Sequence, residues 1–165
     1  MKKRILLYVL AAIIIVSVGL QFDRPLKNNV NDQSKHLSTL YHLPDSVESI
    51  LKVACYDCHS NNTRYPWYFE VQPVGLWLNG HIQDGKKDLN FSEFASYRPR
   101  RQFRKLEQAE ELIKDNKMPI RSYTFMHKDA ILTESQKNLL YAWITVTRDS
   151  MKTIFPPDSL KARKR

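Results

Sequence analysis

Cysteine is scarce in this chain: among its 165 residues only Cys55 and Cys58 occur. A tetrahedral zinc site usually needs four ligands and often a second cysteine pair, so a zinc knuckle is poorly supported. Long stretches that alternate apolar and polar residues are also lacking. That absence weighs against strands, and with them against a thioredoxin-like dithiol, which occurs in a βαβ setting. We therefore predict an all-α fold.

The two cysteines belong to a C-x-x-C-H run that ends at His59. This run is the attachment signal for c-type haem. Thiols add across the two vinyl groups of the porphyrin, and the spacing puts both sulfurs on one side of a helical turn. The adjacent imidazole of His59 then lies beneath the iron as the proximal ligand. We predict one covalent haem c per chain, attached at Cys55 and Cys58.

The amino terminus has an apolar run without charge, from Ile5 to Leu20, directly after three basic residues. Such a run is either a secretory signal or a short membrane anchor. The positive-inside rule keeps the basic residues in the cytoplasm and sends the remainder across the membrane. We favour an uncleaved anchor in the inner membrane with the domain on its periplasmic side. The alternative is cleavage, with Ser17 and Gly19 as small residues near the site, and a soluble periplasmic protein.

The formal net charge of +9 is concentrated in three clusters that contain no acid, at residues 2–4, 98–105 and 161–165. A basic balance can indicate nucleic acid, but an exported domain has little access to it, so no nucleic-acid partner is expected. The cluster at 98–105 is interpreted as a solvated face. Contact with haem propionates or with an acidic redox partner is the alternative.

Four segments follow from these patterns: an anchor or signal over residues 1–21, a polar tether over 22–36, a haem-binding domain over 37–150 and a basic extension over 151–165. The tether is rich in asparagine and lacks a periodic apolar pattern.

Capping signals and helical spacing of apolar residues predict the helices of the domain. Pro44 and Asp45 open the first, whose apolar stripe continues to both cysteines. Capping boxes at Asn90 and Thr133 introduce a brief helix and the final helix. Two more are expected over residues 73–83, ended by 85–88, and over 99–116.

Aromatic residues lie in and before the helix predicted over residues 73–83. Tyr65 and Trp67 precede this helix, and Trp77 lies within it. They are expected to pack in the core and to line the flat face of a porphyrin. A backbone carbonyl near Pro66 or Pro73 is expected to accept from the Nδ1 proton of the haem-ligating histidine.

A six-coordinate haem needs a second axial ligand, and four residues are candidates for it. Met118 lies in a loop before the last helix, stiffened by the following proline, and is preferred. His81 is the runner-up, while Met126 and His127 follow in the same region as Met118. His36 and His42 are given no role.

Three segments of the chain resemble the haem-binding domain family of exported bacterial proteins, a c-type cytochrome-like group. They are CYDCHSNNTRYPWY, GLWLNGHIQDGKKDLNFSEF and MPIRSYTFMHKDAILTESQKNLLYAWI. The resemblance covers about residues 37–147. It implies a small cytochrome c-like helical domain with covalent haem at Cys55 and Cys58, His59 as proximal ligand and Met118 as the matching methionine. Where the family often has Gly-Arg, this chain has Gly85 and Lys86, and a lysine cannot make a paired contact with a propionate.

These patterns predict a membrane-tethered monohaem cytochrome that transfers single electrons to redox partner proteins in the cell envelope, and not an enzyme. One alternative is a peroxidase-type haem enzyme, in which His81 or His127 supplies the acid–base group. Another is a haem-based sensor or scaffold. The haem is expected to be structural as well, because a domain of this size buries a modest core.

Overall fold

The computed structural model of the protein describes residues 2–161, and within that range it contains helices and no strand, so the all-α prediction is confirmed. A single isolated bridge pairs Asn29 with Asn62. The α-helices are α1 Lys2–Leu20, α2 Asp45–Ala54, α3 Tyr56–His59, α4 Val74–Asp88, α5 Pro99–Lys114, α6 Arg121–Met126, α7 Glu134–Ile154 and α8 Pro157–Leu160. The 3-10 helices are η1 Leu37–Thr39, η2 Trp67–Glu70, η3 Phe91–Ser96 and η4 Lys128–Ala130.

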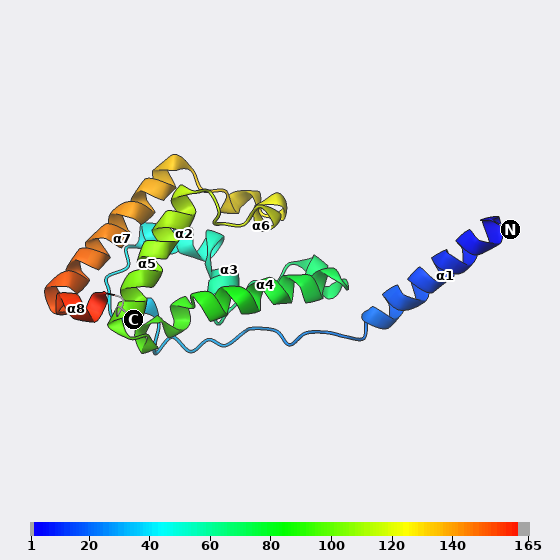
Figure 1. Ribbon diagram of the computed structural model, residues 1–165, viewed down its shortest axis with the longest axis horizontal. Coiled ribbons are helices and arrows are strands. Elements are labelled where there is room, and N and C mark those ends of the chain that lie inside the picture. The colour runs from blue at the N-terminus through cyan, green and yellow to red at the C-terminus, as the bar shows by residue number, and fades with distance from the viewer. Residues whose placement is uncertain (1, 162–165) are drawn as a thin grey trace.

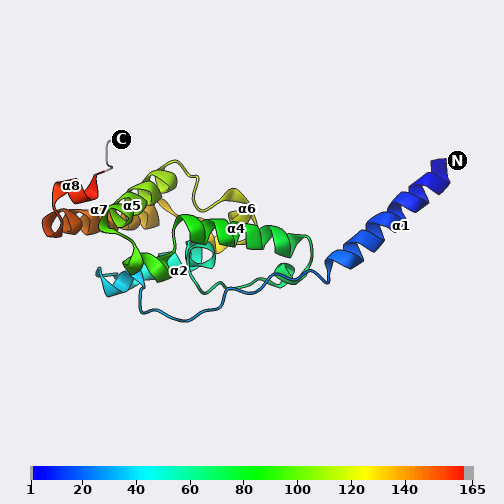
Figure 2. The same cartoon turned by 60° about the horizontal axis from the view of Figure 1, so that its bottom comes forward.

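Helix α1 projects from one end of the molecule, and the segment after it runs along the domain toward η1 (Figures 1 and 2). It buries none of its residues against the domain. By length and composition, helix α1 is long and apolar enough to cross a membrane. A signal sequence has the same properties.

The larger core lies between α2, α5 and α7, which contribute apolar residues at helical spacing. Helices α5 and α7 pack side by side, and α2 lies across them (Figure 1). The capping box that was predicted before α7 is present, with the Thr133 side chain accepting from the Gln136 backbone N–H. The buried residues include Ile50, Leu51, Leu106, Ile113, Leu140 and Ile144.

A smaller core joins α4 to η2 and α3, and its residues are Phe69, Leu78 and Ile82. Helix α4 differs from its prediction in length and in orientation. It continues through residues 85–88, which were expected to end it, and its buried face carries Gly75, Leu78 and Ile82, whereas Trp77 is half exposed. The reason is close packing, because a Cβ on Gly75 would lie 2.0 Å from the Phe69 carbonyl oxygen.

The helix that begins at Pro44 was predicted to continue through both cysteines, and the structure has two helices there instead. Helix α2 ends at Ala54, Cys55 has a φ of −129°, and a separate turn, α3, carries the rest of the motif. As a result Cys55 packs against the larger core and Cys58 against the smaller one. The motif therefore joins the two halves of the domain.

The packed part of the chain continues beyond residue 150. Helix α7 extends to Ile154, Met151 is fully buried, and Leu160 on α8 joins the larger core. Helix α8 packs against α5. Of the basic tail predicted at 161–165, residues 162–165 lie outside the described residues.

Candidate functional site

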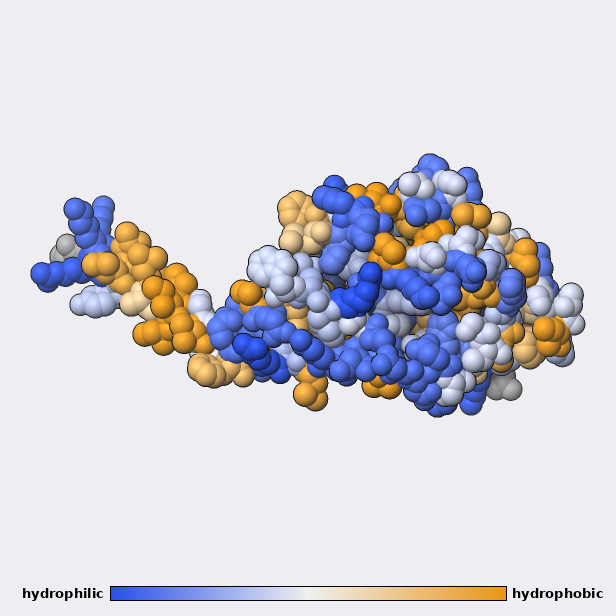
Figure 3. Space-filling view, turned by 180° about the vertical axis from the view of Figure 1, so that it is seen from behind, coloured by the Kyte–Doolittle hydropathy of each residue, from blue (hydrophilic) through white to orange (hydrophobic). Residues whose placement is uncertain are grey.

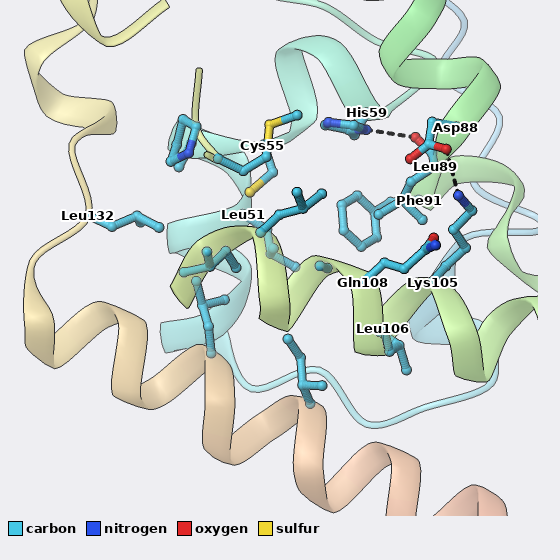
Figure 4. A pocket seen from close by; sticks show the side chains of 18 of the residues that line it. Leu51, Cys55, His59, Asp88, Leu89, Phe91, Lys105, Leu106, Gln108 and Leu132 are labelled. Atoms are coloured by element: carbon cyan, nitrogen blue, oxygen red, sulfur yellow. Dashed lines mark hydrogen bonds and ion pairs between the residues drawn. The ribbon is translucent and has the colours of Figure 1, made fainter. Parts of the chain in front are cut away.

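A cleft runs past the C-x-x-C-H turn, and its innermost part is an apolar hollow with a cavity volume of about 80 Å³. Side chains from α2, α5 and α7 point into it around Cys55 and His59 (Figure 4). The lining includes Leu51, Phe91, Leu106, Leu112, Ile113, Met118, Leu132, Leu140 and Ile144.

Two further hollows continue the cleft outward. The middle one has a cavity volume of about 280 Å³ and shares Cys55, His59 and Met118 with the inner hollow. The outer one has a cavity volume of about 260 Å³. The middle and outer hollows have in common Cys58, His81, Ile120 and Tyr123. Both cysteines, the adjacent histidine and the preferred methionine therefore line one continuous cleft.

The imidazole of His59 is held by two backbone carbonyls. Its Nδ1 lies 2.9 Å from the Leu89 oxygen (Figure 4) and 3.0 Å from the Gly85 oxygen. Since both oxygens are acceptors, Nδ1 carries the proton. Burial lowers the pKa of His59, which favours the neutral ring. Nε2 then keeps a free lone pair, as an iron ligand requires. The expected acceptor near Pro66 or Pro73 was wrong, because the end of α4 packs directly over α3.

Gly85 makes this arrangement possible. A Cβ at this position would lie 2.6 Å from the Cys58 carbonyl oxygen and 3.1 Å from the Cys58 Cβ. Only a residue without a side chain lets α4 approach the motif this closely. The neighbouring Lys86 points elsewhere, with its Nζ 2.5 Å from Asn28 Oδ1. Lys86 therefore holds the tether.

Both cysteines are free thiols whose surroundings keep them protonated. Burial raises the pKa of Cys55 to about 12 and that of Cys58 to about 11. Cysteines of catalytic dithiol motifs have lowered pKa values instead. Among residues 2–161 no group of three or more His, Cys, Asp or Glu side chains could hold a metal ion. Dithiol redox chemistry and zinc binding are thus both disfavoured.

Met118 is positioned by the end of α5. Asn116 adopts a φ of 53°, a left-handed conformation that asparagine tolerates. The chain then turns back, and the Met118 N–H donates to the Leu112 carbonyl oxygen at 3.1 Å. This loop brings Met118 into the lining of the same two hollows as His59.

The other candidate ligands occupy different positions. His81 lines the middle and outer hollows, with its Nδ1 3.1 Å from the Trp77 carbonyl oxygen. Met126 lines the outer hollow only. The Nε2 of His127 lies 2.8 Å from the Tyr68 hydroxyl, so this nitrogen is already paired. Beside Met118, His81 is thus the candidate that shares a hollow with His59.

The aromatic candidates are divided between the cleft and the tether. Trp67 and Trp77 line the outer hollow while remaining largely exposed. Tyr65 lies apart from these side chains. Its hydroxyl accepts from the Asn28 backbone N–H at 2.6 Å, and its ring packs on Phe69.

A buried carboxylate was missed by the sequence reasoning. Asp57 lies between the two cysteines, is buried, and accepts from the Tyr123 hydroxyl at 2.7 Å and the Arg64 backbone N–H at 3.0 Å. The Arg64 side chain adds an ion pair at 3.2 Å. A buried carboxylate needs hydrogen-bond donors or a cation as partners. The position of this acid between two core-facing cysteines was the sequence signal that could have revealed the contact. The contact joins α3 to the segment that follows Met118.

The basic residues at the start of α5 border two different hollows. Lys105 lines the inner hollow and pairs with Asp88 at 2.6 Å. The arginines of the cluster and Lys87 of α4 border a polar hollow at the amino-terminal end of α5, which shares Asp88 and Lys105 with the inner hollow. These arginines are Arg98, Arg100, Arg101 and Arg104. Lys105 alone of this cluster therefore borders the apolar cleft as well.

Fold and site together define a helical domain built around a cofactor: two protonated thiols, an oriented neutral imidazole and a thioether line one apolar cleft. These donors fit haem. A family model described as haem-binding domain matches residues 15–146, and the chain belongs to this family and binds haem. No curated protein and no solved structure matches the chain.

Proposed function

We propose that the protein is a membrane-tethered monohaem c-type cytochrome that carries single electrons in the cell envelope. The observation that carries the proposal is the arrangement of His59, with Nδ1 bonded to carbonyls and Nε2 available, beside two thiols in an apolar cleft. Haem, when bound, supplies an iron that exchanges one electron at a time.

Cys55 and Cys58 are proposed to attach the haem covalently. Each thiol adds its S–H bond across one vinyl group, so a thioether forms and no oxidant or reductant is consumed. The two residues line the middle hollow together, which supports attachment of one macrocycle. The assignment of both thiols to attachment also leaves no dithiol for other chemistry.

Met118 is proposed as the second axial ligand. Its loop is fixed by the helix end at Leu112, and it lines the hollows that His59 lines. Ligation by His and Met raises the reduction potential of haem. The apolar lining contributes in the same direction, because a dry surrounding disfavours the more positively charged oxidised state.

Helix α1 is proposed to remain as an anchor in the inner membrane, with the haem domain on the periplasmic side. Its length and apolar composition support this, and the basic residues before Ile5 indicate the orientation. The partners are then other redox proteins of the envelope. A signal sequence that is removed after export is the alternative.

We propose electron transfer rather than catalysis. The position of His81 is the observation that favours peroxidase-type catalysis instead. His81 lines the middle hollow with His59, so it could act as an acid–base group at an iron whose methionine leaves. If His59 and Met118 both held the iron, no coordination position would be left for a substrate.

The absorption spectrum of the oxidised holoprotein distinguishes an electron carrier from a haem enzyme. We expect a methionine–iron charge-transfer band in the near-red region that is lost in Met118→Ala and retained in His81→Ala. The matched His81 variant controls for disturbance of the cleft. Absence of the band from the wild type, together with rapid carbon monoxide binding and peroxide turnover, would contradict the carrier function.

A further inference from the structure

The end of helix α1 is bonded directly to the haem domain. Gln21 follows α1, and its side chain donates to the Gln72 carbonyl oxygen and accepts from the Gln72 N–H, both at 3.0 Å. A second link follows, in which Glu70 pairs with Arg24 at 3.0 Å and with Lys27 at 2.6 Å. The domain is therefore held at a defined distance from the carboxyl end of α1.

The length of α1 decides where this contact lies relative to a bilayer. Its apolar part, residues 5–20, extends about 24 Å, somewhat less than the roughly 30 Å of a hydrocarbon core. If α1 spans the membrane with its basic residues on the cytoplasmic side, Gln21 lies at the outer edge of the hydrocarbon. The headgroup layer beyond it is about 5–8 Å thick. Because its backbone is bonded to the Gln21 side chain, Gln72 then lies close to that layer.

Several exposed apolar side chains lie on the segments next to Gln72, beside the exposed ion pairs of Glu70 with Arg24 and Lys27. We call this set of apolar side chains the membrane face and define it by Phe22, Trp67, Val71, Val74 and Trp77. Trp67 is 77% exposed and Phe22 is 85% exposed, although both are large apolar side chains. Tryptophan is enriched at membrane–water interfaces because its ring is apolar and its N–H is polar.

These residues lie at the end of the domain that faces α1. The amino-terminal end of α4 and the turn before it are next to the near end of α1 in both ribbon views (Figures 1 and 2). In the space-filling view α1 is an apolar rod that leaves one end of a largely polar domain (Figure 3).

We propose that the membrane face lies in the headgroup layer of the bilayer that α1 spans, so that the domain sits on the lipid surface in one orientation. The inference rests on the proposed function in that it needs an uncleaved anchor. Trp67, Val74 and Trp77 also line the outer hollow. Seating this face on lipid turns the Cys58 end of the cleft toward the membrane and leaves α7 and α8 facing away from it.

Lipid photocrosslinking of the full-length holoprotein tests the orientation. The protein is placed in vesicles of phosphatidylethanolamine and phosphatidylglycerol, with a photoreactive phenylalanine analogue at one position per variant. The positions are Ile13 within α1, Trp67 on the membrane face and Val146 on α7, and Val146 is 69% exposed and serves as the matched apolar control. We expect lipid adducts at positions 13 and 67, with a several-fold lower yield at 146.

Each other outcome would overturn the inference. Equal lipid yields at positions 67 and 146 would mean that the domain tumbles on its tether. Crosslinks from position 67 to a second copy of the chain would make this face a protein interface. Adducts at position 13 without adducts at position 67 would show that α1 is in the membrane but that the membrane face is not in contact with lipid. The absence of an adduct at position 13 would contradict the proposed anchor itself. The same measurement at Val71 checks that the result does not depend on Trp67.

Discussion

Gly85 is the residue whose size matters most for the orientation of His59. Its missing side chain lets the end of α4 lie against Cys58, and its carbonyl is one of the two acceptors for the His59 Nδ1 proton. Gly85 therefore has two roles: its lack of a side chain allows the close packing, and its carbonyl orients His59.

The substitution Gly85→Ala should destabilise the holoprotein. Because the added Cβ would lie 2.6 Å from a backbone oxygen, α4 must shift, at a cost of about 1–3 kcal/mol. The matched control is Gly80→Ala, since a Cβ at Gly80 meets nothing within 4 Å on the same helix. That variant should gain roughly 0.5–1 kcal/mol. Urea unfolding of both variants measures the difference, and equal stabilities would contradict this account of the packing.

His36 gives the protein a pH-dependent stability. It is buried, its Nδ1 lies 2.8 Å from Ser38 Oγ, and its ring packs edge-on against Tyr56. Burial lowers the pKa of His36 below its ordinary value of 6.5; the charge of Glu48 acts in the opposite direction, and that of Lys52 in the same direction as burial. The folded protein therefore binds fewer protons than the unfolded chain at mildly acidic pH.

The free energy of unfolding should fall as the pH decreases from 6.5 through the lowered pKa of His36. The contribution is at most about 1.4 kcal/mol per pH unit. His36→Asn keeps a capping side chain without the titration, so its stability should change less with pH. Urea unfolding above and below pH 6.5 measures both slopes. Parallel slopes for wild type and variant would exclude His36 as the source.

At the scale of the elements, α3 and α6 are joined across the mouth of the cleft. The Tyr123 hydroxyl donates to Asp57 at 2.7 Å, and His127 at the end of α6 pairs with Tyr68. These contacts tie the segment that begins at Met118 to the attachment turn. Burial and the Asp57 hydrogen bond raise the pKa of Tyr123, so the phenol stays a donor.

Tyr123→Phe should loosen the Met118 loop. Removing one donor leaves the buried Asp57 carboxylate less satisfied, which costs about 1–3 kcal/mol. The oxidised variant should bind cyanide faster than the wild type and show a weaker methionine–iron band. Tyr141→Phe, on α7 and outside this loop, is the control. An unchanged cyanide rate in Tyr123→Phe would show that the contact does not hold the loop.

Elements with a local signal are predictable from the sequence, and contacts between distant elements are not. The capping box at Thr133 and the Pro44 helix start are visible in the residues themselves. Which face of α4 is buried depends on how closely Gly75 approaches Phe69, and no periodicity reveals that. The carbonyl partners of His59 and the bond between Asp57 and Tyr123 join segments 26 to 66 residues apart.

At the scale of the whole molecule, the larger core is not complete without a cofactor. The inner hollow, with a cavity volume of about 80 Å³, lies between α2, α5 and α7 and is lined largely by leucine, isoleucine and phenylalanine. Apolar surface left facing an empty space forfeits its packing contacts. We expect haem bound in the cleft to supply those contacts, so that haem binding and folding are coupled.

Cys55→Ser combined with Cys58→Ser should therefore yield a chain that is protease-sensitive and degraded when it is exported with haem-attachment machinery. Met118→Ala, which keeps both thiols, should remain folded and coloured and serves as the control. Limited proteolysis compares them. A protease-resistant, well-folded double variant without haem would show that the domain does not need its cofactor.

The most direct test of covalent haem at Cys55 and Cys58 is the intact mass of the matured protein, read with its pyridine haemochrome spectrum. We predict the mass of the polypeptide plus one haem, retained under denaturing acid, and a spectrum typical of two thioether links. A polypeptide at its bare mass, or haem that acid extraction removes, would contradict the account.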